Sequence, residues 1–158
     1  LITFINSWKQ VREFRESNPL IVKLWRRLES DLKLSAGSPS RLYEVVLPSG
    51  RIKNYWQVVA LKKVTAVTVR GEPPTYLYGG KLTENLVQAV ARDVFVHGYL
   101  NLHRAGFHVP LHVHDENLVE APEDTDPELI TRAMCQRPDW FQSCPIDVEI
   151  KVMDQYSK

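Results

Sequence analysis

Apolar residues recur at helical spacing through the first part of the chain. Phe4, Trp8 and Val11 predict one helix, because residues three or four positions apart lie on the same helix face. Asn18-Pro19 is expected to end that helix and begin another, since asparagine suits the N-cap and proline the first helical position. We assign this helical pair to residues 1–35. The buried stripe of the second helix is expected to comprise Ile21, Leu24, Trp25, Leu28 and Leu32.

The pattern changes to that of strands after a loop rich in serine, glycine and proline at residues 36–40. Leu42–Leu47 and Arg51–Leu61 predict two strands, which the turn residues Pro48-Ser49-Gly50 would join. Alternation over Val64–Val69 predicts a third strand. A small antiparallel sheet is therefore expected near the start of the second predicted part, residues 36–158.

The longest predicted element is a helix from Thr83 to Ala105, and Gly106 stands where a helix-ending glycine belongs. Helices followed by an antiparallel sheet with further helices on it predict the α+β class. After the long helix the pattern predicts a strand, its partner strand, a helix and a final strand, at Val109–His114, Leu118–Ala121, Pro127–Gln136 and Ile146–Val152.

Composition is typical of a globular protein: 158 residues, 44% hydrophobic and 25% charged. No apolar run is long enough to cross a bilayer and the first residues lack a signal-peptide pattern, so we expect a cytoplasmic protein with no membrane partner. Cys135 and Cys144 form no CxxC motif, which excludes a zinc finger and favours two free thiols in a reducing compartment.

Charge is unevenly distributed, although the net charge of +1 does not by itself indicate a nucleic-acid binder. Basic residues crowd between Lys9 and Lys33 and recur from Arg51 to Lys63. Acidic residues crowd between Asp115 and Glu128. This distribution suits a polyanion held near a metal, and it equally suits two ordinary solvated faces.

The segment Leu111–Glu120, LHVHDENLVE, carries the sharpest chemical pattern. Apolar residues alternate with histidines before the turn formers Asp115-Glu116-Asn117, and the apolar pattern then resumes. Asp115 and Glu116 are therefore expected at the tip of a tight hairpin, beside His114. Carboxylates placed there can reach a hard cation, and Mg²⁺ typically takes one or two carboxylates plus substrate phosphates.

Two other interpretations of this segment stay open. Taken as a bare pattern, HDE is also an ordinary acidic turn. His112 and His114 would share one strand face, as in the His-x-His metal site of cupin-like proteins, although no later histidine follows to complete such a site.

The long predicted helix carries a polar stripe opposite its apolar face. A glutamine on such a stripe can read the acceptors of the DNA minor groove, which checks the shape of a base pair without selecting sequence. The alternative is an ordinary solvated helix face. The stripe comprises Lys81, Glu84, Asn85, Gln88 and Arg92.

Several segments resemble family A (DNA polymerase I-like) DNA polymerases. PLHVHDENLVEAP resembles the family's third signature motif, an apolar strand, HDE and a second apolar strand. ENLVQAVARDVF resembles the helix whose glutamine faces the minor groove of the primer–template, and YGGKLTENLVQAVARD is similar to the phage-encoded branch. LPSGR resembles a strand–Gly-Arg turn, SNPLIVKLWRRLE the helix that leaves the fingers, and PDWFQSCPIDVEIKV the closing strand of the palm. These pieces are collinear over nearly the whole chain.

The resemblance implies template-directed nucleotidyl transfer by two Mg²⁺ ions on primer–template DNA and dNTP. It makes Asp115 a metal ligand and a catalytic residue, with Glu116 beside it as the second catalytic residue. It implies a palm-type sheet in residues 36–158 and the end of the fingers in residues 1–35. The DNA-binding residues that it implies are His114, Gln88, Arg92, Arg51, Asn85 and Lys81.

The chain also departs from the family pattern. The motif with the other metal-binding aspartate and the fingers helix that binds the nucleotide are absent, and both would precede Leu1. The first residues, from Leu1, are expected to lie within a helix rather than at its start. We therefore expect a fragment or split subunit, inactive without an N-terminal polymerase half, in a bacterial or phage-infected cell. Asn117 stands where the family usually has an aliphatic residue. Two alternatives are a non-catalytic DNA-binding or assembly module derived from a palm, and an unrelated metal-binding α+β domain.

Overall fold

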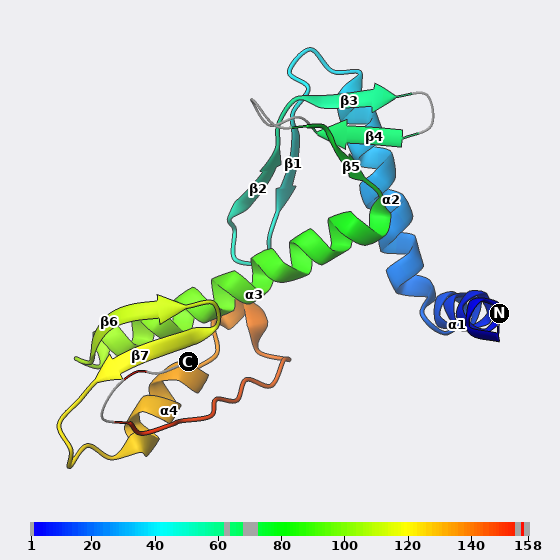
Figure 1. Cartoon of the computed structure of the whole chain (residues 1–158). Coiled ribbons are helices and arrows are strands. Elements are labelled where there is room, and N and C mark those ends of the chain that lie inside the picture. Colours follow the sequence, from blue (N-terminus) through cyan, green and yellow to red (C-terminus); the bar gives the residue numbers. More distant parts are fainter. Residues whose placement is uncertain (1, 62–63, 68–72, 154–155, 157–158) are drawn as a thin grey trace. The chain divides into compact units, whose positions relative to one another are not determined.

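The computed structural model describes residues 2–61, 64–67, 73–153 and 156 (Figure 1). Helices and antiparallel strands occur together, which confirms the predicted α+β class. Within these residues, no helix is both long enough and apolar enough to cross a membrane. The elements in chain order are α1 (Ile2–Ser17), α2 (Pro19–Ala36), β1 (Tyr43–Val46), β2 (Ile52–Tyr55), β3 (Val58–Leu61), β4 (Val64–Val67), β5 (Thr75–Leu77), α3 (Gly79–Arg104), β6 (His108–Val113), β7 (Glu116–Glu120), α4 (Pro127–Cys135) and the 3-10 helix η1 (Asp139–Phe141).

Packing divides the chain into two compact units, Leu1–Ala89 and Val90–Lys158, with the boundary inside α3. The described strands form three small antiparallel sheets. Sheets β1-β2 and β3-β4-β5 belong to the first unit, and β6-β7 belongs to the second. The separate expectation of a helical pair at residues 1–35 followed by a C-terminal part stays a prediction.

The core of the first unit lies between α2 and the two small sheets. Tyr43 of β1 stacks on Tyr55 of β2, with 5.7 Å between ring centroids. Burial raises the pKa of Tyr43 to about 12, so its hydroxyl stays neutral at ordinary pH. Helix α2 thus covers the sheets with its apolar stripe. The buried residues of this core are Leu28, Leu32, Tyr43, Tyr55, Val58, Leu77 and Leu82.

Asn18 and Pro19 separate α1 from α2 as predicted, and Pro19 is the first residue of α2. Asn18 nevertheless makes no side-chain cap on α2. Its Nδ2 instead donates to the carbonyl oxygen of Phe14, at 2.8 Å, in the last turn of α1. The same carbonyl oxygen also accepts the backbone amide of Asn18, at 3.0 Å, so the side chain adds a second hydrogen bond to the end of α1 and caps no amide of α2.

The prediction of one strand over Arg51–Leu61 is wrong, because two strands in different sheets occupy that range. The chain turns between β2 and β3 at Gln57, which has φ 53°. The amide of Val58 then donates to the carbonyl oxygen of Arg41, at 2.9 Å. Strand β5 was not predicted, and the last two residues of the predicted strand Val64–Val69 lie outside the described residues.

Helix α3 begins at Gly79, four residues before the predicted Thr83. A Cβ at Gly79 would lie 2.4 Å from the carbonyl oxygen of Trp25 and 2.6 Å from its Cβ, so only glycine fits against α2 here. The amide of Gly79 donates to Oε2 of Glu29, at 3.4 Å. Lys33 holds the other oxygen at 2.7 Å, and this hydrogen bond lowers the pKa of Glu29. The start of α3 is thereby joined to α2.

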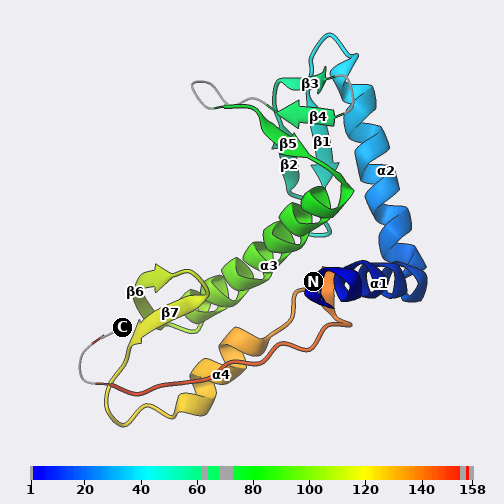
Figure 2. The same ribbon diagram turned by 45° about the vertical axis from the view of Figure 1, so that its right-hand side comes forward.

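In the second unit, the prediction of a final strand over Ile146–Val152 is wrong, since these residues form no strand. The segment runs beside α4 (Figures 1 and 2), with Ile146, Val148 and Ile150 half-buried and their neighbours exposed. The amide of Val148 donates to the side chain of Asp147, at 2.9 Å, rather than to a ladder. The alternating burial at these residues therefore belongs to an extended segment that lies along a helix and not to a strand.

We expect Gly79→Ala to lower the free energy of unfolding by about 1–3 kcal/mol, because neither the Trp25 carbonyl nor its Cβ can move aside without shifting α2. Gly80→Ala is the matched control, since its Cβ would meet only the ring of the exposed Tyr78, at 3.0 Å. Urea unfolding followed by circular dichroism measures both variants. Equal midpoints for the two would contradict the close-contact explanation.

Candidate metal and nucleic-acid site

Asp115 lies at the tip of the β6–β7 hairpin, as predicted, but the turn is shorter than expected. Val113 pairs with Glu116, which leaves His114 and Asp115 as a two-residue turn. His114 has φ 54°, the positive value that a tight hairpin turn requires at its first central position. Glu116 and Asn117, predicted as turn residues, instead begin β7. These two residues lie in the strand and not in the turn because His114 and Asp115 alone already reverse the chain.

Strand pairing fixes which face of the hairpin each side chain occupies. His112 pairs with Asn117, and directly opposed residues share a face. This face packs on the helices, since the Asn117 Nδ2 lies 3.4 Å from the Met134 sulfur in α4. Glu116 lies on the other face with Leu111, whose side chain is 48% exposed. The carboxylate of Glu116 therefore points away from the core of the unit.

The carboxylates of Asp115 and Glu116 are both exposed and adjacent in sequence. They supply the oxygen ligands that Mg²⁺ prefers, so the donor type fits this ion. Oε2 of Glu116 also accepts a hydrogen bond from the Tyr156 hydroxyl, at 3.4 Å. Within the described parts of the chain, no three His, Cys, Asp or Glu side chains gather as a metal site. The hairpin thus offers two carboxylates to a metal, and other ligands would have to come from elsewhere.

Arg92 of α3 fixes the inner face of the hairpin through His112. Its Nη2 lies 3.2 Å from Nε2 of His112, and a guanidinium has no acceptor, so the histidine nitrogen accepts this hydrogen bond. The His112 ring lies 6.1 Å from Phe95 and 6.0 Å from Tyr99, measured between centroids. With His112 engaged on α3 and His114 in the turn, the two histidines do not form the strand pair of the His-x-His alternative.

Four of the predicted DNA-binding residues belong to the first unit. Nη2 of Arg51 donates to the carbonyl oxygen of Ala89, at 3.0 Å, and so fastens the β1–β2 turn to α3. Lys81 donates to Glu84 at 2.8 Å, and this hydrogen bond raises the pKa of Lys81. Gln88 is exposed and Asn85 is half-buried. Their roles in DNA binding stay predictions.

Sequence reasoning missed the contact that seats α4 against α3. A Cβ at Gly98 would lie 3.1 Å from the carbonyl oxygen of Met134 and 3.2 Å from its sulfur. Asn117 reaches the same sulfur from β7, so α3, α4 and the hairpin meet at Met134. A glycine within the apolar stripe of the predicted helix was the available signal, because such a glycine often marks a close approach.

Comparison with known proteins links the chain to a DNA polymerase. Over 94% of its length, the chain is 32% identical to a DNA polymerase of Bacillus phage SP02. The chain spans 27% of the length of that curated relative. No protein-family model matches the chain. No solved structure matches it either. The similarity is thus to part of a phage DNA polymerase.

We expect Asn117→Leu to raise the free energy of unfolding by about 1 kcal/mol, because Oδ1 of Asn117 is buried without a hydrogen-bond partner among the described residues. Leucine keeps the volume and removes this cost. Asn117→Ala removes the same amide but leaves a void beside Met134, so it should bring no gain. The urea concentration at half-unfolding is measured for both variants. A leucine variant less stable than the original chain would show that Oδ1 of Asn117 has a hydrogen-bond partner.

Proposed function

We propose that the chain is the C-terminal palm portion of a family A DNA polymerase, which performs template-directed nucleotidyl transfer together with an N-terminal portion. The observation that carries this proposal is the exposed HDE turn, with Asp115 at its tip, in a chain similar to a phage DNA polymerase along 94% of its length. We place its action in the cytoplasm of a bacterial or phage-infected cell.

In this proposal Asp115 holds Mg²⁺, and its place on a two-residue turn supports the role. The turn leaves the carboxylate exposed while the paired strands on either side limit its movement. Two Mg²⁺ ions, when bound, neutralise charge on the attacking 3′-oxygen and on the leaving pyrophosphate. Glu116, on the outer face of β7, orients the primer end, and His114 contacts the primer strand.

The proposed DNA contacts comprise two kinds of residue. Gln88 is exposed on α3 and suits the degenerate acceptors of the minor groove. The guanidinium of Arg51 fastens the β1–β2 turn to α3, and that of Arg92 fastens the β6–β7 hairpin to α3. Their positive charge is thereby held in place for phosphates, which supply most of the affinity for DNA. Lys81 and Asn85 complete the proposed DNA-binding residues.

An apolar surface on α1 and α2 supports the need for an N-terminal portion. The predicted buried stripe of α2 is buried only at Leu28 and Leu32, whereas Ile21 and Leu24 are 36% and 40% exposed. An exposed apolar patch of this kind is typical of an interaction surface. The described patch consists of Trp8, Val11, Phe14, Leu20, Ile21 and Leu24. We propose that the N-terminal polymerase half covers it.

We expect the purified chain alone to give no templated extension of a primer with Mg²⁺ and dNTP. The two carboxylates of the hairpin cannot by themselves hold two metal ions and a triphosphate. Adding a candidate N-terminal portion from the same genome, with its own aspartate motif and fingers helix, should restore extension. Extension by the chain alone would contradict the two-part proposal.

In the reconstituted enzyme, we expect Asp115→Asn to reduce the extension rate by orders of magnitude while leaving primer–template affinity within about twofold. Asparagine keeps the size of the side chain but loses the charge that holds Mg²⁺. Asp124→Asn removes an equal charge from an exposed loop position and is the matched control.

Gln88→Ala should instead weaken extension from matched and mismatched primer ends by different amounts, since it removes a minor-groove contact and no metal ligand. Steady-state rates and binding titrations are compared in parallel for these three variants. Near-normal extension by Asp115→Asn would mean that the metal site is not on this hairpin.

A further inference from the structure

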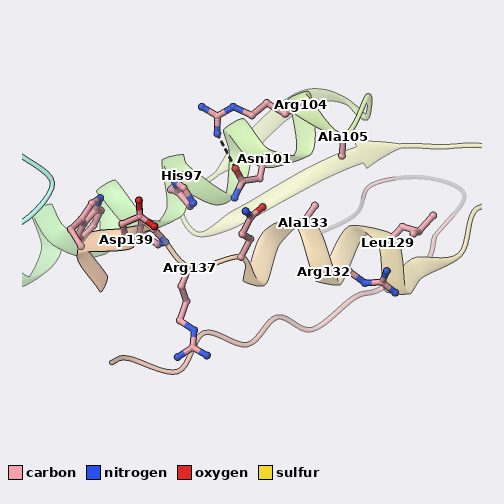
Figure 3. Close-up of a pocket in the computed structure, with 12 residues that line it drawn as sticks. His97, Asn101, Arg104, Ala105, Leu129, Arg132, Ala133, Arg137 and Asp139 are labelled. Carbon is pink, nitrogen blue, oxygen red and sulfur yellow. Dashed lines mark hydrogen bonds between the residues drawn. The ribbon is translucent and has the colours of Figure 1, made fainter. Parts of the chain in front are cut away.

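Helix α3 lines a pocket of about 700 Å³ on the side that faces α4 (Figure 3). The residues around η1 complete its walls. Figure 3 shows the arginines of this pocket pointing to different sides, so the pocket offers no single position to an anion. The residues that α3 contributes to the pocket are His97, Asn101 and Arg104. The side of α3 turned away from this pocket carries a different set of side chains.

That other side of α3 carries a row of polar and aromatic side chains. Spacings of three, four and four residues place them one above another along the helix. The guanidinium carbon of Arg92 lies over the Phe95 ring, 5.2 Å from its centroid. The rings of Tyr99 and His103 meet edge to face, with 4.7 Å between their centroids. The row comprises Arg92, Phe95, Tyr99 and His103.

His112 of β6 seats the hairpin on this row. Its ring lies 6.1 Å from that of Phe95 and 6.0 Å from that of Tyr99, measured between centroids. Its Nε2 accepts the hydrogen bond from Nη2 of Arg92, at 3.2 Å, so the neutral ring must carry its proton on Nδ1. A guanidinium has five N–H donors, and this bond leaves the others for a DNA phosphate.

His112 belongs to the inward-facing strand pair that lies nearest the turn. It pairs with Asn117, whereas the Val113–Glu116 pair, between them and the turn, faces outward. The side chain of His112 contacts α3 and that of Asn117 contacts α4. Only the outward pair separates these contacts from the two-residue turn. The place where His112 rests on α3 therefore determines where the Asp115 carboxylate lies.

We propose that His112 is a positioning residue for the Asp115 turn and acts through its hydrogen bond with Arg92. Contacts between rings tolerate sliding, whereas a hydrogen bond is directional, so Nε2 fixes where along the row the strand rests. The inference rests on the proposed function for the task of the turn. A metal ligand must be held within about 0.5 Å of its productive position, and an anchor close to the turn meets that requirement.

Two substitutions separate the hydrogen bond from the ring contacts. In His112→Gln, the amide oxygen lies about as far from Cβ as Nε2 does, so it can accept from Arg92. In His112→Asn, the amide oxygen lies near the former position of Nδ1 and falls short of Arg92. Both variants lose the contacts with Phe95 and Tyr99, so they should melt at similar temperatures. Any difference between them then reports the hydrogen bond.

The placement of the turn is tested on the intact chain alone. In mildly alkaline solution, ¹⁵N NMR of the original chain should show the His112 proton on Nδ1. The backbone amide signals of His114 and Asp115 should stay close to their original positions in His112→Gln and move in His112→Asn. A proton on Nε2, or equal movement of these signals in the two variants, would overturn the proposal.

The effect on chemistry is tested in the reconstituted enzyme. His112→Asn should lower kcat for primer extension about tenfold or more, while primer–template affinity changes less than about threefold. His112→Gln should restore kcat to within about threefold of the original. Equal losses of kcat in the two variants would also refute the positioning role. If the original reconstituted enzyme extends no primer, the proposed function fails, and the amide signals still decide the placement of the turn.

Discussion

The two-residue turn at His114-Asp115 is the constraint on which the rest of the hairpin depends. With only two residues in the turn, Val113 must face Glu116, and the next two pairs, His112 with Asn117 and Leu111 with Leu118, follow from that register. An irregularity between Leu111 and His108 then shifts the pairing before His108 meets Glu120. The register turns His112 and Asn117 toward the helices and leaves Glu116 on the open face. If the turn also contained Glu116, Val113 would pair with Asn117 and His112 with Leu118, which would place Leu118 against Met134 and turn the Asn117 amide to the open face. The positive φ of His114 is the local strain that this arrangement requires.

Most of the element order could be predicted from the sequence because it rests on periodicity. The helices around Trp8, Leu28 and Leu102 and the hairpin after Gly106 follow from apolar spacing and turn formers. The separation of β2 from β3 could not be predicted, since it depends on Gln57 adopting a positive φ and on a bond to Arg41. The start of α3 was also hidden, because Gly79 is a poor helix former that only the contact with Trp25 explains.

Part of the candidate site could likewise be predicted from the sequence, and part could not. An exposed carboxylate at residue 115 follows from turn chemistry, and the hairpin confirms that placement. The position of Glu116 could not be predicted from the sequence, because a shift of one residue in a strand moves a side chain to the opposite face. The pocket near Asn101 has no periodic signature at all. It arises from side chains on α3, on α4 and around η1 whose meeting depends on how closely the two helices approach.

That approach has a consequence for how the sequence can change over time. Helix α4 packs closely on α3 at Gly98, where a Cβ would lie 3.1 Å from the carbonyl oxygen of Met134 and 3.2 Å from its sulfur. A larger residue at position 98 requires Met134 to shift or to become smaller, and Asn117 touches the same sulfur. A substitution at position 98, 117 or 134 therefore changes which residues fit at the other two positions. Among relatives that keep this packing, substitutions at one of them should be accompanied by substitutions at the others, so the contact would be visible as covariation.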